Sequence, residues 1–170
     1  RLFANAGHLQ LFVSIALESG ARSGELLDLD FDDVDVEDQR FTLWDDDTKA
    51  NRQRFGHFGT RTKSLLTRQE GAVIKNTKGV GYTVQSGTGS TIAKQFKTAC
   101  ERAGITDATP HTLRHTWATW AMAIDPNMIR VKAHGGWSSV SQLERYAKLA
   151  PHGYGEKVRK AGWELFGKFQ

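Results

Sequence analysis

Residues 109–120 read TPHTLRHTWATW and open a predicted helix. Thr109 suits an N-cap and Pro110 suits the first helical position. His111 and Arg114 stand three residues apart, so they share one face at the end of the helix where free backbone N–H groups favour an anion. A different stripe is apolar and can face a core while this pair looks outward: Leu113, Trp117 and Ala121. Taken alone, the segment fits either an anion site or an ordinary amphipathic helix.

The length and composition are those of one globular domain. The chain has 170 residues, of which 39% are hydrophobic and 25% charged, and it is long enough to bury a core of its own. No apolar run approaches the length that spans a membrane. A single cysteine, Cys100, excludes an internal disulfide and a multi-cysteine zinc site and fits a reducing compartment. We therefore expect one domain over residues 1–170, located in the cytoplasm.

Charge is distributed unevenly along the chain. Residues 1–48 carry 12 acidic and 3 basic residues, whereas residues 49–170 carry 7 acidic and 20 basic residues. A basic region of this size, spread over several predicted elements, favours a polyanion such as nucleic acid as a partner. A solvated charged surface with no specific partner is the alternative.

The first predicted helix ends in a turn that carries an arginine. Residues 9–17 (LQLFVSIAL) are apolar enough for a buried helix, and Gly20 lies near its end. Arg22 follows the glycine, and Glu25 stands three residues further on, on the same face of a second short helix. Arg22 can therefore point into a cleft with Glu25 bracing it, or the two can form an ordinary surface ion pair.

A small antiparallel sheet is predicted next. Residues 40–44 (RFTLW) and 54–58 (RFGHF) have the aromatic and β-branched content of strands, and the polar connection between them carries Lys49 near its tip. The acidic stretch 28–38 lacks the glycine and the terminal glutamate of a calcium loop and leads into the sheet. With helices on both sides, the expected fold class is mainly α with a small antiparallel β-sheet.

Further helices follow the sheet. Residues 71–90 are expected to form loops around one weak strand, and they contain no phosphate-binding glycine motif. Three later segments show helical periodicity: residues 91–103, 126–134 and 140–149. Tyr146 lies at the edge of the apolar stripe of the last one, a position typical of a packing tyrosine whose hydroxyl meets water. An amphipathic tail follows over residues 157–169.

Six side chains scattered along the chain suit one chemistry. They are Arg22, Lys49, His111, Arg114, Trp137 and Tyr146. Two guanidiniums, an imidazole and a lysine supply the fixed donors that a pentacoordinate phosphoryl group requires. A phenol is a weak nucleophile at its ordinary pKa near 10, so two arginines and a base are the neighbours that its attack needs.

Four motifs in this order resemble those of a known enzyme family. They are GARSGE at 20–25, HTLRH at 111–115, GGW at 135–137 and ERYA at 144–147. Each is weak alone, but together they resemble the catalytic motifs of tyrosine recombinases, the phage-type integrases. The resemblance implies a largely helical catalytic domain with a small three-stranded sheet, which cuts one DNA strand without metal or cofactor.

The resemblance also implies a role for each candidate. Tyr146 would attack the scissile phosphate and form a 3′-phosphotyrosyl link, while Arg22 and Arg114 would clamp the non-bridging oxygens. His111 would act as general acid/base toward the tyrosyl oxygen. Trp137 would contact the phosphate through its indole N–H and by packing.

Three further residues would support these groups. Lys49 would protonate the departing 5′ oxygen, Glu25 would brace Arg22, and His115 would act from behind the residues that touch the phosphate. The segment after Lys49 lacks the proline-containing strand usual in the family, so Lys63 and Lys75 are the fallback lysines.

Two other features depart from the family pattern. His134 stands where relatives usually carry an aliphatic residue, and nothing before residue 1 corresponds to the family's separate DNA-clamping domain. We therefore expect an excised catalytic domain that binds DNA weakly, because phosphate contacts supply much of the affinity. The C-terminal tail, residues 153–170, is expected to dock on its own domain or on another protomer.

Double-stranded DNA and other protomers of the same protein are the expected partners, with no membrane. The resemblance implies four protomers acting on two duplexes, and the isolated domain is expected to be a monomer. Two alternatives stay open: a type IB topoisomerase-like enzyme, and a non-catalytic basic DNA-binding module in which Tyr146 only packs. The GGW and ERYA motifs favour the recombinase over the topoisomerase.

Overall fold

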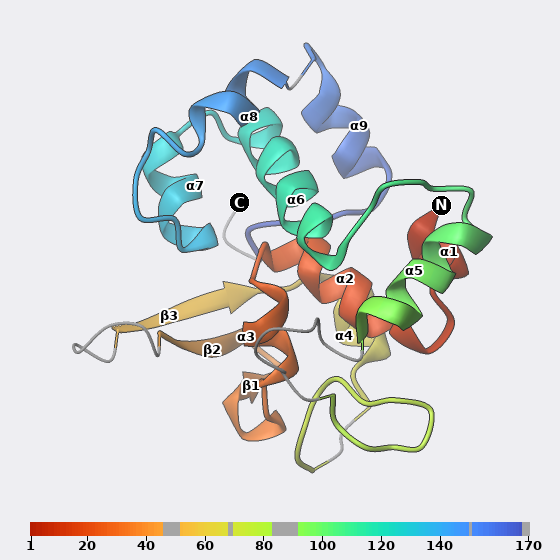
Figure 1. The fold of residues 1–170 in the computed structure, drawn as a ribbon. Helices are drawn as coiled ribbons and strands as arrows, with labels where there is room; N and C mark the ends of the chain where they lie inside the picture. Colours follow the sequence, from red (N-terminus) through yellow and green to blue (C-terminus); the bar gives the residue numbers. More distant parts are fainter. Residues whose placement is uncertain (46–51, 68–69, 83–91, 150, 168–170) are drawn as a thin grey trace.

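The structure is a computed structural model that describes residues 1–45, 52–67, 70–82, 92–149 and 151–167. The N-terminal elements are α1 (Leu2–Asn5), η1 (Gly7–Leu9), α2 (Gln10–Ser19), α3 (Ser23–Leu27) and η2 (Phe31–Asp33). The middle elements are β1 (Val34–Asp35), β2 (Arg40–Asp45), β3 (Arg52–His57), α4 (Thr60–Leu65) and α5 (Ile92–Arg102). The C-terminal elements are α6 (Pro110–Ile124), α7 (Met128–Gly135), α8 (Glu144–Leu149) and α9 (Tyr154–Lys160). The expected fold class, mainly α with a small antiparallel sheet, is confirmed (Figure 1).

The sheet has the strand order β1-β2-β3, and both neighbouring pairs are antiparallel. Phe41 and Leu43 of β2 are buried, whereas Trp44, the next residue along the strand, is exposed. Leu43 pairs directly with Arg54 of β3. Because directly paired residues share a face of the sheet, the Arg54 side chain lies on the buried side, toward the helices.

The core consists of two clusters of buried apolar side chains. The first surrounds α2, whose residues from Phe12 to Ser19 are all buried, and it includes side chains from α3, the sheet and α5. The second joins α6 to α7, α8 and α9. Trp117 of α6 is fully buried, and its indole Nε1 donates to the Glu18 carbonyl at 2.9 Å, which ties α6 to α2. Figure 1 shows α6 running between these two groups of elements.

Helix α6 begins where the sequence predicts. Pro110 occupies its first turn, and the Thr109 backbone N–H donates to the Thr112 hydroxyl at 3.0 Å. The apolar stripe is buried as expected, since Leu113, Trp117 and Ala121 are all at most 4% exposed. The start of this helix is therefore fixed by local sequence, and its direction by the burial of one face.

Helix α8 begins later than predicted. The helix expected from residue 140 starts at Glu144, and the preceding serines form local hydrogen bonds instead, with Ser139 pairing with Ser141 at 2.9 Å. Serine hydroxyls that find partners nearby favour turns over helix interiors. The later start places Tyr146 in the first turn of α8, where it is 3% exposed. Tyr146 therefore packs in the core as expected, and its hydroxyl also has bonding partners within the protein.

The described part of the C-terminal tail packs on its own chain. After α9, Leu165 and Phe166 are buried in the second cluster. The Glu164 carboxylate accepts hydrogen bonds from the Thr60 backbone N–H and hydroxyl, both at 3.1 Å, at the start of α4. Exchange of the tail onto another protomer stays a prediction.

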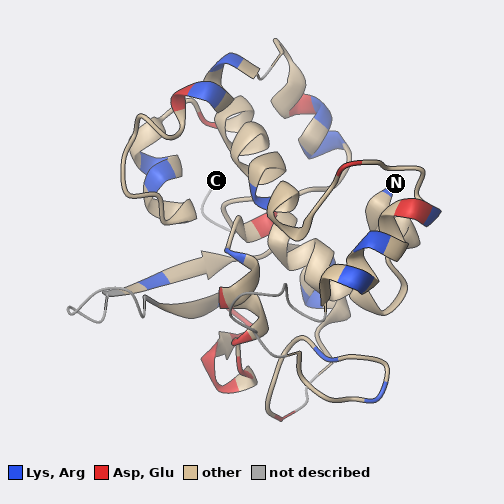
Figure 2. Ribbon diagram, viewed as in Figure 1, with Lys and Arg blue, Asp and Glu red and all other residues tan. Residues whose placement is uncertain are grey.

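Acidic residues are most concentrated in one part of the molecule. Figure 2 shows acidic residues gathered around η2 and β1, whereas Lys and Arg occur on α5, α7, α8 and α9. No helix in the described part of the chain has the length and apolarity needed to cross a membrane.

Candidate active site

A pocket of about 510 Å³ opens between α3, α6, α8 and the turn after α7. The described residues that line it are Arg22, His111, Arg114, His115, Trp137, Ser141, Gln142, Arg145 and Tyr146. Five of the six predicted candidates thus line one pocket. All four motifs contribute to these five residues. HTLRH supplies two of them, and GARSGE, GGW and ERYA supply one each.

The predicted lysines are not among those lining residues. Lys49 lies outside the residues that the structure describes. Lys63 pairs with Glu37 at 3.2 Å, and the Lys75 Nζ donates to the Glu70 carbonyl at 2.9 Å. The two fallback lysines therefore lie away from the pocket, and the assignment of Lys49 stays a prediction.

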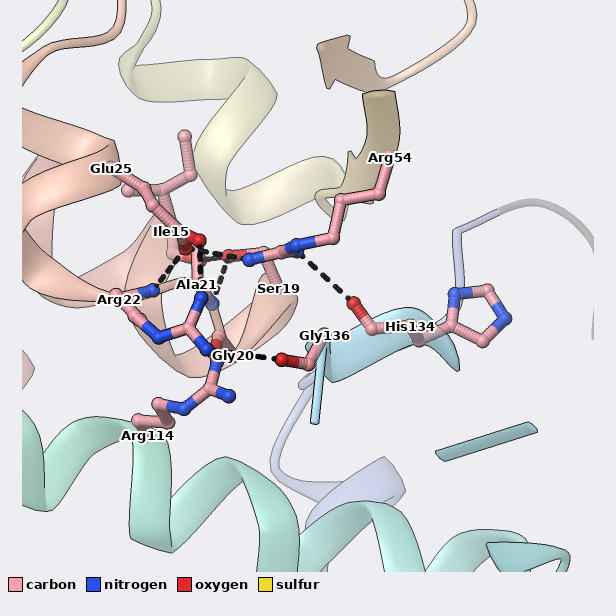
Figure 3. Close-up of polar contacts among 10 residues, drawn as sticks. All are labelled: Ile15, Ser19, Gly20, Ala21, Arg22, Glu25, Arg54, Arg114, His134 and Gly136. Carbon is pink, nitrogen blue, oxygen red and sulfur yellow. Dashed lines mark hydrogen bonds and ion pairs between the residues drawn. The ribbon is translucent and has the colours of Figure 1, made fainter. Parts of the chain in front are cut away.

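The turn after α2 sets the position of Arg22. Gly20 ends α2 with φ of 67°, in the left-handed region that favours glycine, and Arg22 is the N-cap of α3. Both the Arg22 backbone N–H and its Nη1 donate to the Glu25 carboxylate, at 2.6 and 2.9 Å. Its Nη2 donates to the Gly136 carbonyl at 3.2 Å (Figure 3). Glu25 thus both caps α3 and aims the guanidinium, so the predicted contact between the two is present.

Arg54 is a third guanidinium near the pocket, which the sequence analysis did not single out. Its Nη2 donates to the Glu25 carboxylate at 2.6 Å and its Nη1 to the His134 carbonyl at 3.3 Å (Figure 3). Burial alone would raise the pKa of the Glu25 carboxyl, but the charges and hydrogen bonds of Arg54 and Arg22 outweigh it and hold that pKa below its usual value. The carboxylate therefore stays ionised and joins the two arginines.

Arg114 lies inside the protein, which corrects the expectation that it looks outward from α6. The residue is 4% exposed, and its Nη1 donates to the Gly20 carbonyl at 2.6 Å. The guanidinium also lies 3.8 Å from the centre of the Trp137 ring, a cation–π contact. Burial, with the nearby positive charge of Arg22, lowers the pKa of Arg114 to about 10, so it remains charged at neutral pH. The long Arg114 side chain carries its guanidinium from a buried position on α6 to the pocket.

Trp137 forms one wall of the pocket. Its ring stacks on Trp117, with 5.7 Å between ring centroids and an interplanar angle of 14°. Gly135 is required by this packing, because a Cβ at that position would lie 1.7 Å from a Trp137 ring atom. The GGW motif thus supplies the space for the ring and, through the Gly136 carbonyl, an acceptor for Arg22.

The phenol of Tyr146 has two polar partners. Its hydroxyl forms a short hydrogen bond with His115 Nδ1 and accepts a hydrogen bond from the Arg145 guanidinium at 2.5 Å. His111 in turn contacts His115, since their two rings meet edge to face with 4.5 Å between centroids. Burial and nearby positive charges lower the pKa values of both histidines, so both are neutral at pH 7.

His134 turns its ring away from the arginines of the pocket (Figure 3). The ring lies 5.4 Å from that of His57 and 5.2 Å from that of Phe166, between centroids. Its carbonyl, rather than its imidazole, faces the site through the bond from Arg54. The side chain at this position therefore packs against the sheet and the tail.

Two functional neighbours were missed, and each left a signal in the sequence. Arg54 stands at an inward position of a predicted strand, where an unpaired charge is costly, so it requires an acidic partner such as Glu25. Arg145 precedes Tyr146 directly, but adjacent residues on a helix face different directions. The guanidinium reaches the hydroxyl by folding back over the phenol ring, 4.7 Å from its centre, which spacing rules do not indicate.

The arrangement is suited to holding an anion next to a nucleophile. Arg22 and Arg114 present two guanidiniums, which bind phosphate oxygens well, and the Tyr146 phenol lines the same pocket. Among the described residues, no group of three or more His, Cys, Asp or Glu side chains is placed to hold a metal ion.

The pocket's residues belong to a region that matches a known family. The model of the phage integrase family matches residues 3–152, which include every described residue that lines the pocket. The chain belongs to the phage integrase family. This result confirms the resemblance that the four motifs indicated.

Individual members of the family are similar over most of the chain. An integrase of Salmonella phage P22 is 27% identical over 94% of this chain and 43% of its own length. The tyrosine recombinase XerA of Saccharolobus solfataricus is 28% identical over 82% of this chain and 45% of its own length. The chain thus spans less than half the length of both integrase-family relatives.

Solved structures of the family share the fold. The catalytic domain of bacteriophage HP1 integrase matches 94% of this chain and 88% of its own, with 26% identity and a TM-score of 0.67. The crystal structure of a XerA recombinase matches 94% of this chain and 61% of its own, with 20% identity and a TM-score of 0.72. The expected integrase catalytic-domain fold is therefore confirmed.

Proposed function

We propose that this chain is the catalytic domain of a site-specific DNA recombinase or integrase, which breaks and rejoins DNA through a 3′-phosphotyrosyl intermediate. The observation that carries the proposal is the meeting of Arg22, Arg114, His111 and Tyr146 at one pocket in a member of the phage integrase family. Relatives named integrase and tyrosine recombinase support this assignment.

In the proposed reaction, the Tyr146 oxygen attacks the phosphorus of one DNA strand and the bond to the 5′ oxygen breaks. Arg22 and Arg114 balance the negative charge that develops on the non-bridging oxygens. The phenolic proton passes to a histidine of the HTLRH motif, a role that the family resemblance gives to His111. The Trp137 indole contacts the phosphate, and Lys49 supplies a proton to the departing 5′ oxygen. A 5′ hydroxyl from another strand then attacks the phosphotyrosyl link and rejoins the DNA.

Glu25 is assigned a positioning role in this reaction. Its carboxylate holds Arg22 by two hydrogen bonds and Arg54 by a third. The guanidinium of Arg22 is half-exposed and has many rotamers, so these contacts reduce the entropy lost on binding phosphate. His115, which forms a hydrogen bond with the Tyr146 hydroxyl, is the second residue that supports the reacting groups.

Double-stranded DNA and further copies of the protein are the proposed partners. The basic helices α5, α7, α8 and α9 provide positive charge for the DNA backbone (Figure 2). A structure of the XerH recombinase bound to its difH substrate in a post-cleavage complex has the same fold, with a TM-score of 0.67. We place the reaction in the cytoplasm, where bacterial and phage DNA are recombined.

The proposal is tested by trapping the covalent intermediate. The probe is a pool of duplexes with randomised sequence around a nick, because a cut near the nick releases a short fragment and prevents rejoining. We expect a protein–DNA adduct that survives detergent, that is absent for Tyr146→Phe, and that is kept by the matched control Tyr154→Phe on α9. DNA binding without any adduct would instead indicate a non-catalytic module. Relaxation of an intact supercoiled plasmid, with no exchange of strands between two intact duplexes, would indicate a topoisomerase-like enzyme.

A further inference from the structure

The hydrogen bonds around Tyr146 identify a proton acceptor other than the one that the family resemblance implies. The phenol oxygen contacts His115 Nδ1 and the Arg145 guanidinium. The resemblance assigns acid/base catalysis at this oxygen to His111. In the structure, however, the hydrogen bonds described for the phenol oxygen are those with His115 and Arg145, and the His111 ring meets the His115 ring edge to face.

Donor and acceptor capacities fix the direction of the bond from Arg145 and favour one direction for the bond with His115. A guanidinium has donors and no acceptor, so Arg145 occupies a lone pair of the phenol oxygen. Tyr146 is 3% exposed, and the hydroxyl hydrogen and the Nδ1 lone pair of a neutral imidazole can satisfy each other at this contact. We therefore assign the hydroxyl as the donor to Nδ1, with the His115 proton on Nε2.

The charge state of His115 agrees with this direction. The groups that face its ring are His111 and Arg114 on α6 and Arg145 on α8, and none of them is an acid. Burial and these charges lower the pKa of the imidazole, so the ring is neutral at pH 7 and its Nδ1 lone pair is available. The rings of His115 and Tyr146 lie 5.7 Å apart with an interplanar angle of 30°, which keeps the acceptor beside the hydroxyl.

We propose that His115 is the catalytic base that accepts the phenolic proton of Tyr146, and that Arg145 holds the phenol oxygen during the transfer. The proposal rests on the recombinase function proposed above and deepens it. As the oxygen–phosphorus bond forms, the O–H bond of Tyr146 breaks and its proton moves to His115 Nδ1, which gives an imidazolium. The phosphorus–O5′ bond breaks at the same time, and the 5′ oxygen takes the proton assigned to Lys49.

His111 is thereby free to serve the phosphate. It lines the same pocket as the two guanidiniums and stands one helical turn before His115 on α6. The two histidines of the HTLRH motif then divide the work, one toward the phosphate oxygens and one toward the nucleophile.

Chemical rescue distinguishes the two histidines. Adduct formation is measured on the nicked duplex for His115→Ala and His111→Ala, with and without added imidazole, and for the control His152→Ala between α8 and α9. We expect His115→Ala to be slower by about 10²- to 10⁴-fold, the usual contribution of a general base. Imidazole should restore its rate in proportion to the free-base concentration. Rescue of His111→Ala by imidazole, with no rescue of His115→Ala, would overturn the proposal.

A second variant separates basicity from packing. Asn at position 115 can accept a hydrogen bond near the place of Nδ1 but cannot take a proton at neutral pH. We expect His115→Asn to unfold at a temperature close to that of the unmodified protein and to form the adduct as slowly as His115→Ala. A His115→Asn variant that reacts at the unmodified rate would show that His115 only positions the phenol.

A measurement without DNA keeps this proposal separate from the recombinase function. If the unmodified protein forms no adduct, the proposed function fails, and nitrogen NMR of the free protein still tests the bond. We expect an unprotonated Nδ1 and a protonated Nε2 on His115, with an Nδ1 shift that changes in Tyr146→Phe. A proton on Nδ1, or a shift that Tyr146→Phe leaves unchanged, would exclude the transfer.

Discussion

Arg114 carries its charge in a buried position, where one backbone carbonyl and one aromatic ring are its partners. Replacing it with alanine leaves the Gly20 carbonyl unpaired and removes the cation from the Trp137 ring. We expect Arg114→Ala to abolish the adduct and also to lower the free energy of unfolding by about 1–3 kcal/mol, the usual cost of an unpaired buried polar group. Urea unfolding measures this change. An unchanged unfolding free energy would mean that the Gly20 contact is dispensable.

Glu25 holds two guanidiniums through one carboxylate. Because its pKa lies below the usual value in the folded protein, its ionised form stabilises the fold above the ordinary pKa near 4.5, and this contribution is lost as the pH falls through the lowered pKa. We expect Glu25→Gln to reduce the unfolding free energy at pH 7 by about 1–3 kcal/mol and to lose less stability than the unmodified protein on acidification. Urea unfolding at several pH values measures both effects.

The control for this change is Glu37→Gln, because Glu37 also pairs with a cation, Lys63, but its side chain is 89% exposed. Exposed ion pairs contribute roughly 0–1 kcal/mol. Equal losses in the two variants would show that burial of the Glu25 carboxylate adds nothing.

At the residue scale, sequence reasoning identified the side chains whose type and spacing are distinctive. Arg22, His111, Arg114, Trp137 and Tyr146 all reach the pocket. The sequence did not reveal which histidine touches the phenol, because His111 and His115 are one helical turn apart and either can face it. Side-chain direction and the position of α8 decide that question, and both depend on tertiary packing.

Gly20 connects an element boundary to the site. Its φ of 67° favours glycine, and a Cβ would lie 2.4 Å from the Trp117 ring. Gly104 after α5 has a similar φ of 65°, but a Cβ there meets nothing within 4 Å. We expect Gly104→Ala to cost about 1–2 kcal/mol from the backbone alone and Gly20→Ala to cost about 1–3 kcal/mol more from overpacking. Thermal and urea unfolding compare the pair, and equal losses would contradict the clash with Trp117.

Glu18 joins α2 to the start of α4. Its Oε2 accepts from the Gly59 backbone N–H at 2.7 Å, while Oε1 has no hydrogen-bond partner among the described residues. Burial, with the charge of Glu164, raises the pKa of Glu18 despite the opposing effects of Thr62, Gly59 and Arg61. A raised folded-state pKa means that stability is lost as the pH rises from the ordinary value near 4.5 through the raised one.

Glu18→Gln removes this titration while it keeps an oxygen for the Gly59 N–H. We therefore expect the variant to gain stability relative to the unmodified protein as the pH is raised from 4.5 toward neutrality. The melting temperatures of both proteins across this range measure the difference. A difference that stays constant or shrinks with rising pH would contradict the assigned direction of the pKa shift.

At the element scale, helix α6 and the β2–β3 pair follow from local sequence, because capping residues and strand periodicity are strong local signals. Helix α8 does not, since residues 140–143 have helical periodicity but the serines before them find partners in turns. Nor does the path of the tail, which depends on the burial of Leu165 and Phe166 in one cluster with apolar side chains of α6 and α9.

At the scale of the whole molecule, the site lies where the two core clusters meet. Arg22 and Arg54 of the first half bond carbonyls of residues 136 and 134, and Arg114 bonds the carbonyl of residue 20. A phosphate held by Arg22 and Arg114 would therefore stabilise both halves together. At about ten times its dissociation constant, such a ligand contributes about 1.4 kcal/mol.

For a chain of this size, that stabilisation corresponds to a rise in melting temperature of about 3–5 °C. We expect inorganic phosphate to produce this rise relative to chloride at equal ionic strength, and we expect Arg22→Ala to lose it. The control Arg40→Ala lies on the sheet, away from the pocket, and should keep it. Equal shifts in all three proteins would indicate a general salt effect instead of binding at the site.

The central claim is that the phenol of residue 146 attacks DNA within this pocket. The most direct test is mass spectrometry of the peptide that carries the covalently bound nucleotide after protease and nuclease digestion of the trapped adduct. The chain has three tyrosines, at positions 82, 146 and 154. We predict a single modified peptide with the nucleotide on Tyr146, and a nucleotide on Tyr82 or Tyr154 would contradict the account.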